Sequence, residues 1–176
     1  YDFQKDLIGR IRVDKGTDKD KLKYGAGISF YQGGRRMASS FKWSMGVDSL
    51  GLNCFEQEQD TQNFGKIAPR QHIGADAQLS LQWAGGTSTL RGEFISGNTP
   101  SSSTSVSTAS TQPAGDTYQR NFSGYYFYFI QRIMKSRHEI MMKYDVFDPN
   151  VDVSGNDIGK TISGTGNYLS TNRADI

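Results

Sequence analysis

The stretch that decides the fold is Ile73-Gly-Ala-Asp-Ala-Gln-Leu-Ser-Leu-Gln-Trp83. Its odd-numbered positions are all apolar, and its even-numbered positions hold only glycine, aspartate, glutamine and serine. Successive side chains of a β-strand point to opposite faces of a sheet, so this pattern predicts a strand with one apolar and one polar face. No helical period fits the stretch as well.

Five other segments alternate with less regularity, and aromatic or β-branched residues support a strand in each. These segments are 7–13, 24–30, 89–95, 122–130 and 140–146. The expected apolar faces carry Leu7, Gly9, Ile11 and Val13, then Tyr24, Ala26, Ile28 and Phe30, then Leu90, Gly92 and Phe94, then Phe122, Gly124, Tyr126, Tyr128 and Ile130, and finally Ile140, Met142, Tyr144 and Val146. The sequence therefore predicts an all-β protein with about six strands.

Composition narrows the class of protein. The chain has 176 residues, of which 35% are hydrophobic and 12% aromatic, and a disordered chain would lack these aromatics. A formal net charge of +2 does not indicate a nucleic-acid partner. No apolar stretch is long enough for a membrane-spanning helix, but a membrane β-strand needs only about ten residues. The single cysteine, Cys54, excludes a disulfide within the chain.

The connections between the expected strands alternate in length. The short ones are 14–23, 84–87 and about six residues around Met134, whereas the long ones are 31–70, 98–119 and 148–173. Outer-membrane barrels have this alternation, with short periplasmic turns and long extracellular loops. We therefore expect residues 1–176 to form a single partial domain of an antiparallel up-and-down transmembrane β-barrel, with the three long loops extracellular.

Six strands are too few for such a barrel. Membrane barrels have eight or more strands, and an open sheet would leave unpaired edges in hydrocarbon. We therefore expect the chain to be a fragment of a larger barrel, or the barrel to be completed by other chains.

Several segments also resemble porins of the phosphate-selective porin O and P family, most closely the Bacteroidetes-type members. The resemblance lies in Tyr24-Gly-Ala-Gly-Ile-Ser-Phe-Tyr-Gln-Gly-Gly34, Gly74-Ala-Asp-Ala-Gln-Leu-Ser-Leu-Gln-Trp83, Gly-Tyr-Tyr-Phe-Tyr-Phe at 124–129 and Lys143-Tyr-Asp-Val-Phe-Asp-Pro-Asn150. It implies a Gram-negative outer membrane, a barrel of about sixteen strands, a homotrimer and passive uptake of small polar or anionic solutes, phosphate among them. These are expectations for a parent protein, because this chain is far too short for that barrel.

Charged residues occupy the polar positions of the expected strands. If the apolar face meets lipid, these residues line a water-filled lumen, where arginine and lysine favour anions. The alternative is that the charges pair with one another and select nothing. The basic members are Arg10, Arg12, Arg91 and Lys143, and the acidic members are Asp76, Glu93 and Asp145.

Two motifs and an aromatic cluster have simpler alternatives. Asp148, Asn150 and Asp152 offer oxygen ligands for calcium, but Val153 stands where an EF-hand loop needs glycine, so a turn closed by Asx hydrogen bonds is the alternative. The segment 155–161 has three residues between its glycines where a phosphate-binding loop has four. Residues 125–129, with Trp83 and Tyr144, suit a membrane aromatic girdle, with a soluble core or a stacking platform as alternatives.

The rival interpretation of the whole chain is a soluble β-sandwich or barrel that binds a ligand. We do not expect an enzyme, because the sequence offers no nucleophile or acid–base set in context, and His72 and His138 lack a second ligand at metal spacing. We expect no cofactor either. The expected partners are small polar or anionic solutes and outer-membrane lipid.

Overall fold

The computed structural model describes residues 5–17, 19, 21–47, 53–102, 115–134 and 136–153. Nearly all of them lie in strands, and no helix in this part of the chain is long and apolar enough to cross a membrane. The strands are β1 (Leu7–Lys15), β2 (Leu22–Arg36), β3 (Phe41–Val47), β4 (Asn53–Gln59), β5 (Ile67–Trp83), β6 (Gly86–Ser102), β7 (Thr117–Ile133) and β8 (Glu139–Asp148), and a 3-10 turn, η1 (Thr61–Asn63), precedes β5.

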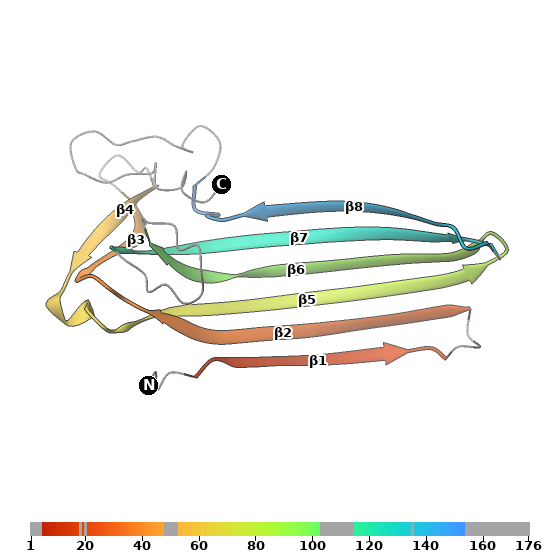
Figure 1. Cartoon of the computed structure of the whole chain (residues 1–176), viewed down its shortest axis with the longest axis horizontal. Helices are drawn as coiled ribbons and strands as arrows, with labels where there is room; N and C mark the ends of the chain where they lie inside the picture. The colour runs from red at the N-terminus through yellow and green to blue at the C-terminus, as the bar shows by residue number, and fades with distance from the viewer. Residues whose placement is uncertain are drawn as a thin grey trace.

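Six long strands form one antiparallel sheet in the order β1-β2-β5-β6-β7-β8 (Figure 1). They contain the six segments expected from the sequence, so the antiparallel all-β prediction is confirmed. Among the described residues the sheet is open, because β1 pairs only with β2 and β8 pairs only with β7.

The short connections all lie at one end of the sheet, which we call the turn end (Figure 1). The tightest connection is Ala84-Gly85 between β5 and β6, as the sequence predicts. Gly86 follows it with a φ of 124°, and a Cβ there would lie 1.9 Å from the carbonyl oxygen of Arg132. Only glycine fits this turn without strain.

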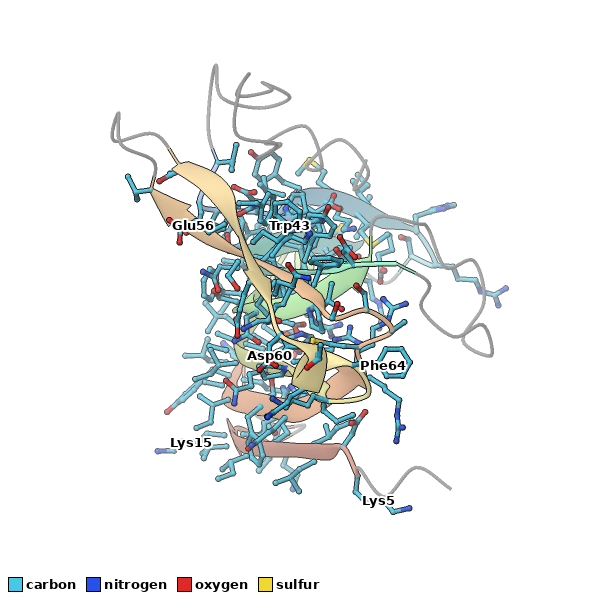
Figure 2. All side chains as sticks on the ribbon, turned by 90° about the vertical axis from the view of Figure 1, so that its left-hand side faces the viewer. Lys5, Lys15, Trp43, Glu56, Asp60 and Phe64 are labelled. Atoms are coloured by element: carbon cyan, nitrogen blue, oxygen red, sulfur yellow. The ribbon has the colours of Figure 1, made fainter. Side chains whose placement is uncertain are left out.

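The opposite end, which we call the mouth end, differs from the expectation of long unstructured loops. β2, β5, β6 and β7 extend beyond the segments expected for them, and the segment 31–70 contains an unexpected hairpin of β3 and β4. β3 also forms a short parallel ladder with β7, where Lys42 and Trp43 pair with Thr117 and Tyr118. Viewed from this end, β4 runs across the stack of strand ends (Figure 2).

Residues that pair across neighbouring strands share a face of the sheet, so the registers trace rows across it. One row runs through Tyr24, Leu79, Leu90, Phe129 and Met142. We call the face with this row the apolar face and the opposite one the charged face. The expected apolar faces of β1, β2, β5, β6 and β8 all lie on the apolar face.

The expected apolar face of β7 is wrong. Tyr125, Phe127 and Phe129 pair with apolar-face residues of β6, whereas Tyr126 pairs with Glu93. The residues expected on the apolar face lie instead on the charged face: Phe122, Gly124, Tyr126, Tyr128 and Ile130. Because β7 is aromatic at both phases, its own sequence does not identify the face, and the neighbouring strands do.

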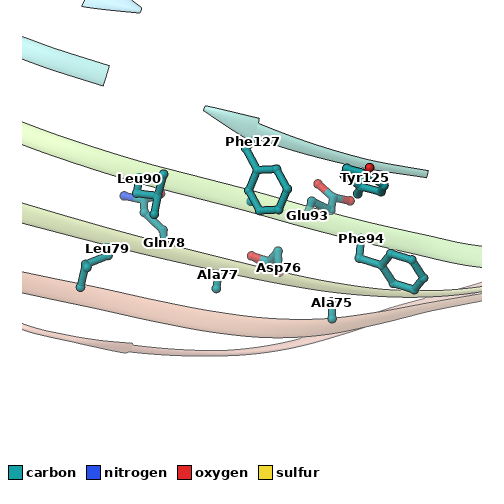
Figure 3. Close-up of a pocket in the computed structure, with 11 residues that line it drawn as sticks. Ala75, Asp76, Ala77, Gln78, Leu79, Leu90, Glu93, Phe94, Tyr125 and Phe127 are labelled. Atoms are coloured by element: carbon teal, nitrogen blue, oxygen red, sulfur yellow. The ribbon is translucent and has the colours of Figure 1, made fainter. Parts of the chain in front are cut away.

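Buried apolar side chains gather at the mouth end rather than under the sheet. They are Met37, Trp43, Phe55, Ala68, Tyr118, Phe122 and Val153. The apolar face has no cover among the described residues: Ile73, for example, is 64% exposed. A shallow groove of about 680 Å³ lies on this face. Figure 3 shows Ala75 and Ala77 along one side of it and the larger Phe94 and Phe127 on the neighbouring strands.

Candidate functional site

The charged face is the candidate functional surface. All seven charged residues singled out in the sequence lie on it, because one row joins Arg12, Asp76, Glu93 and Asp145 and the neighbouring rows contain the others. The alternation of each strand places them there. Whether this face lines a pore remains a prediction.

Two arginines of β1 reach across β2 to a carboxylate of β5. Arg10 Nη2 lies 2.6 Å from Asp76 Oδ1, and Arg12 Nη1 lies 3.3 Å from the same oxygen. Arg12 also pairs with Asp14 of its own strand at 2.8 Å. Both arginine side chains therefore extend along the sheet, across β2, toward Asp76.

Glycine in β2 makes this crossing possible. Gly27 stands between Arg12 and Asp76 in the row, and a Cβ at Gly27 would lie 2.5 Å from the other oxygen of Asp76. Gly25, two residues earlier, likewise lies beneath the Asp14 carboxylate. A side chain at either position would displace the ion pairs.

The remaining charges are also paired or bonded. The Tyr126 hydroxyl donates to Glu93 at 2.6 Å, and Lys143 Nζ lies 3.1 Å from Asp145. Arg91 donates to the Gln78 side chain at 3.1 Å and has no carboxylate partner among the described residues. With Asp14 included, four basic and four acidic residues face one another here: Arg10, Arg12, Arg91 and Lys143 against Asp14, Asp76, Glu93 and Asp145.

A more basic group, absent from the sequence analysis, lies toward the mouth end of the same face. Arg35 and Arg70 are close enough for each to oppose the other's charge, and no described carboxylate pairs with either. Burial and Arg70 lower the pKa of Arg35, and the same two causes lower the pKa of His72. Arg70 lies over the Tyr31 ring at 5.4 Å. The Tyr31 hydroxyl donates to Asp6 at 2.7 Å, so one carboxylate lies near this group. The face is therefore balanced in charge at its middle, and at its mouth end Arg35 and Arg70 outnumber Asp6.

The β3–β4 hairpin packs on the charged face at this end. Trp43 stacks on Tyr118 with ring centroids 5.7 Å apart, and Phe55 meets Tyr118 edge-on at 5.3 Å. Arg120 lies over Phe55, is 3% exposed, and burial lowers its pKa to about 10. Asp116 accepts hydrogen bonds from Trp43 Nε1 at 3.0 Å and from Ser39 at 2.7 Å. These contacts hold the hairpin against β7.

No protein-family model matches the chain, and no curated protein or solved structure matches it either.

The candidate calcium ligands form a turn. Asp148 Oδ1 accepts from the backbone N–H of Asn150, and Asn150 Oδ1 accepts from that of Asp152. Asp152 Oδ2 accepts from the side chain of Asn121 at 3.0 Å. These are the Asx hydrogen bonds given as the alternative to calcium, and no group of three His, Cys, Asp or Glu suited to a metal occurs among the described residues. The segment 155–161 lies outside the described residues.

Proposed function

We propose that this chain forms part of the wall of a porin in a Gram-negative outer membrane, through which small polar or anionic solutes diffuse passively. The observation that carries the proposal is the uncovered apolar face. Its large side chains are exposed, whereas the opposite face of the same strands carries ion pairs. In water this exposed apolar area would favour association, and in a bilayer it meets hydrocarbon.

The height of the apolar band, meaning the part of the apolar face that holds apolar side chains, supports a bilayer around this face. On β5 the apolar positions run from Ile73 to Trp83, which corresponds to roughly 33 Å along a strand. A tilt of about 40° shortens this to roughly 25 Å, which is the height of the apolar band of outer-membrane barrels. Beyond Ile73 the same face turns polar, with Gln71 paired to Asn98.

The proposal includes further strands. The free edges of β1 and β8 would expose backbone polar groups to hydrocarbon, so each edge must pair in a membrane. The resemblance to the porin O and P family implies a barrel of about sixteen strands and a trimer. We propose both for the protein that contains this wall.

The charges indicate weak selectivity. The balanced middle of the charged face favours neither sign, whereas at the mouth end Arg35 and Arg70 outnumber Asp6 and raise the local concentration of anions slightly. We therefore propose a general path for small solutes with a modest preference for anions, and phosphate is one such anion.

The porin is tested by conductance. The protein, purified in detergent and added to planar lipid bilayers, should produce stepwise currents and remain in the membrane fraction of reconstituted vesicles. A protein that is monodisperse without detergent and gives no current would contradict the porin and favour the soluble ligand-binding module. That module requires a second layer over the apolar face.

Asp76→Asn should increase anion selectivity. The substitution removes the carboxylate shared by Arg10 and Arg12, which leaves the Arg10 charge facing the solutes while Arg12 keeps Asp14. In a potassium chloride gradient the reversal potential should therefore shift toward the chloride value. Glu58→Gln, which removes an equally charged but 59% exposed side chain on the hairpin, is the control and should shift it less. Equal shifts would mean that the Asp76 cluster does not face the ion path.

A further inference from the structure

A recess of about 430 Å³ lies at the turn end, at the border of the apolar face. Its lining consists of Lys15, Gly16, Lys21, Leu22 and Tyr24. Two lysines thus line a recess together with two large side chains, of which Leu22 is 46% and Tyr24 48% exposed. An amphiphile with an anionic head and an apolar tail has the matching chemistry.

The register fixes how charge and apolar surface meet in this recess. Lys15 pairs with Tyr24, which pairs in turn with Leu79, so the lysine continues an apolar row. Lysine on such a row lays its methylene stem on apolar surface and extends its ammonium toward water. Lys21 lies in the turn itself, and its backbone carbonyl accepts from Gln82 on β5, which fixes the turn beside the sheet. No described carboxylate pairs with Lys15 or Lys21.

The two borders of the apolar face differ. At the mouth end the first polar row carries no charge: beside Leu7 of β1 it contains the amides Gln32, Gln71, Asn98 and Asn121. At the turn end the border carries the two lysines instead. The lysines therefore lie directly beside the apolar band at the turn end, whereas Arg36, the cation of this phase on β2 at the mouth end, lies four residues beyond Gln32.

We propose that the recess binds an anionic membrane phospholipid, with Lys15 and Lys21 at the headgroup phosphate and Leu22 and Tyr24 against the start of an acyl chain. Basic side chains at a membrane border attract anionic lipids, and tyrosine favours the boundary between headgroups and chains. This site rests on the proposed function, because a lipid reaches the recess only if the apolar face lies in a bilayer.

The test is native mass spectrometry of the protein released from neutral detergent micelles that contain equal amounts of phosphatidylglycerol and phosphatidylcholine with identical acyl chains. The wild-type protein should retain phosphatidylglycerol in preference. Lys15→Gln or Lys21→Gln should each reduce that preference roughly fivefold, and the double variant roughly 25-fold. Lys23→Gln is the matched control. Lys23 lies on β2 between Leu22 and Tyr24, but its side chain belongs to the charged face, so this variant should keep the preference for phosphatidylglycerol.

Equal retention of the two lipids, or an equal loss in Lys23→Gln, would overturn the lipid site. Displacement of phosphatidylglycerol by an equimolar amount of inorganic phosphate would also overturn it, because the recess would then bind a free phosphate without using the apolar contacts. Conductance of the same samples separates the two proposals. Conducting protein without lipid preference contradicts only the lipid site, whereas protein that never enters a bilayer contradicts the porin as well.

Discussion

Replacing Ala77 with arginine should lower the stability of the protein in lipid by about 2–4 kcal/mol, the cost of arginine on the lipid face of a barrel near the bilayer midplane. Ala77 is exposed in the middle of the apolar face, in one row with Ala26 and Gly92. Its small neighbours leave room for the longer side chain, so the cost comes from the charge rather than from a clash. Urea unfolding of the protein folded into vesicles measures the loss.

Two controls isolate the charge at this position. Ala77→Leu adds apolar bulk on the same face and should change the stability by less than about 1 kcal/mol, because lipid accommodates it. Gln78→Arg places the same charge one residue later, on the charged face, where it loses the hydrogen bond from Arg91 and should cost about 1 kcal/mol. If Gln78→Arg were as damaging as Ala77→Arg, the two faces would not meet different solvents.

The faces of most strands followed from the sequence because one phase was apolar and the other was not. β7 was the exception, because both of its phases are aromatic. Tyrosine belongs on either face, since its ring suits lipid and its hydroxyl bonds a carboxylate. Only the cross-strand partners decide between the two: Glu93 bonds Tyr126, and Lys143 lies over Tyr128. That information lies in other strands.

The hairpin was missed although part of its signal is in the sequence. Residues 41–47 alternate regularly, with apolar side chains at every odd position, and they could have been read as a strand inside the long connection 31–70. Residues 53–59 do not alternate, and the packing of their strand depends on the contact of Phe55 with Tyr118, which is distant in the sequence. The mouth-end arginines were missed because the predicted strands ended before Arg35 and began after Arg70. Both strands continue there, but their apolar-face positions hold Gln32, Gly34 and Gln71 instead of large apolar residues. The alternation that marks a strand therefore stops before the strand does.

The charged positions were predictable one by one, but their pairing was not. Arg10 and Asp76 are joined across a whole strand, and this contact depends on the registers of two strand pairs and on a glycine between them. From the sequence alone, four basic residues at polar strand positions predicted a lumen that favours anions. With the registers, the carboxylates neutralise most of that charge, and the expected selectivity becomes modest.

Trp43→Ala should detach the β3–β4 hairpin while leaving the long strands folded. Trp43 is 9% exposed, stacks on Tyr118 and donates to Asp116, whereas none of the six long strands other than β7 depends on it. Removing a buried tryptophan costs about 3–5 kcal/mol. Here that cost lowers the free energy that separates the packed hairpin from the opened one. Trypsin cleavage after Lys42, which requires that opening, should accelerate roughly a hundredfold or more.

The controls for this prediction distinguish anchoring from general damage. Trp43→Phe keeps an aromatic ring over Tyr118 but loses the hydrogen bond to Asp116, so cleavage should accelerate far less. Trp83→Ala removes the other tryptophan, which is 54% exposed at the turn end, and should leave cleavage after Lys42 unchanged. If Trp43→Ala instead unfolded the entire sheet, the small core at the mouth end would be holding the long strands together, which contradicts a sheet supported by its own ladders and by lipid. Unchanged cleavage in Trp43→Ala would mean that the hairpin is held by its link to β5 and not by β7.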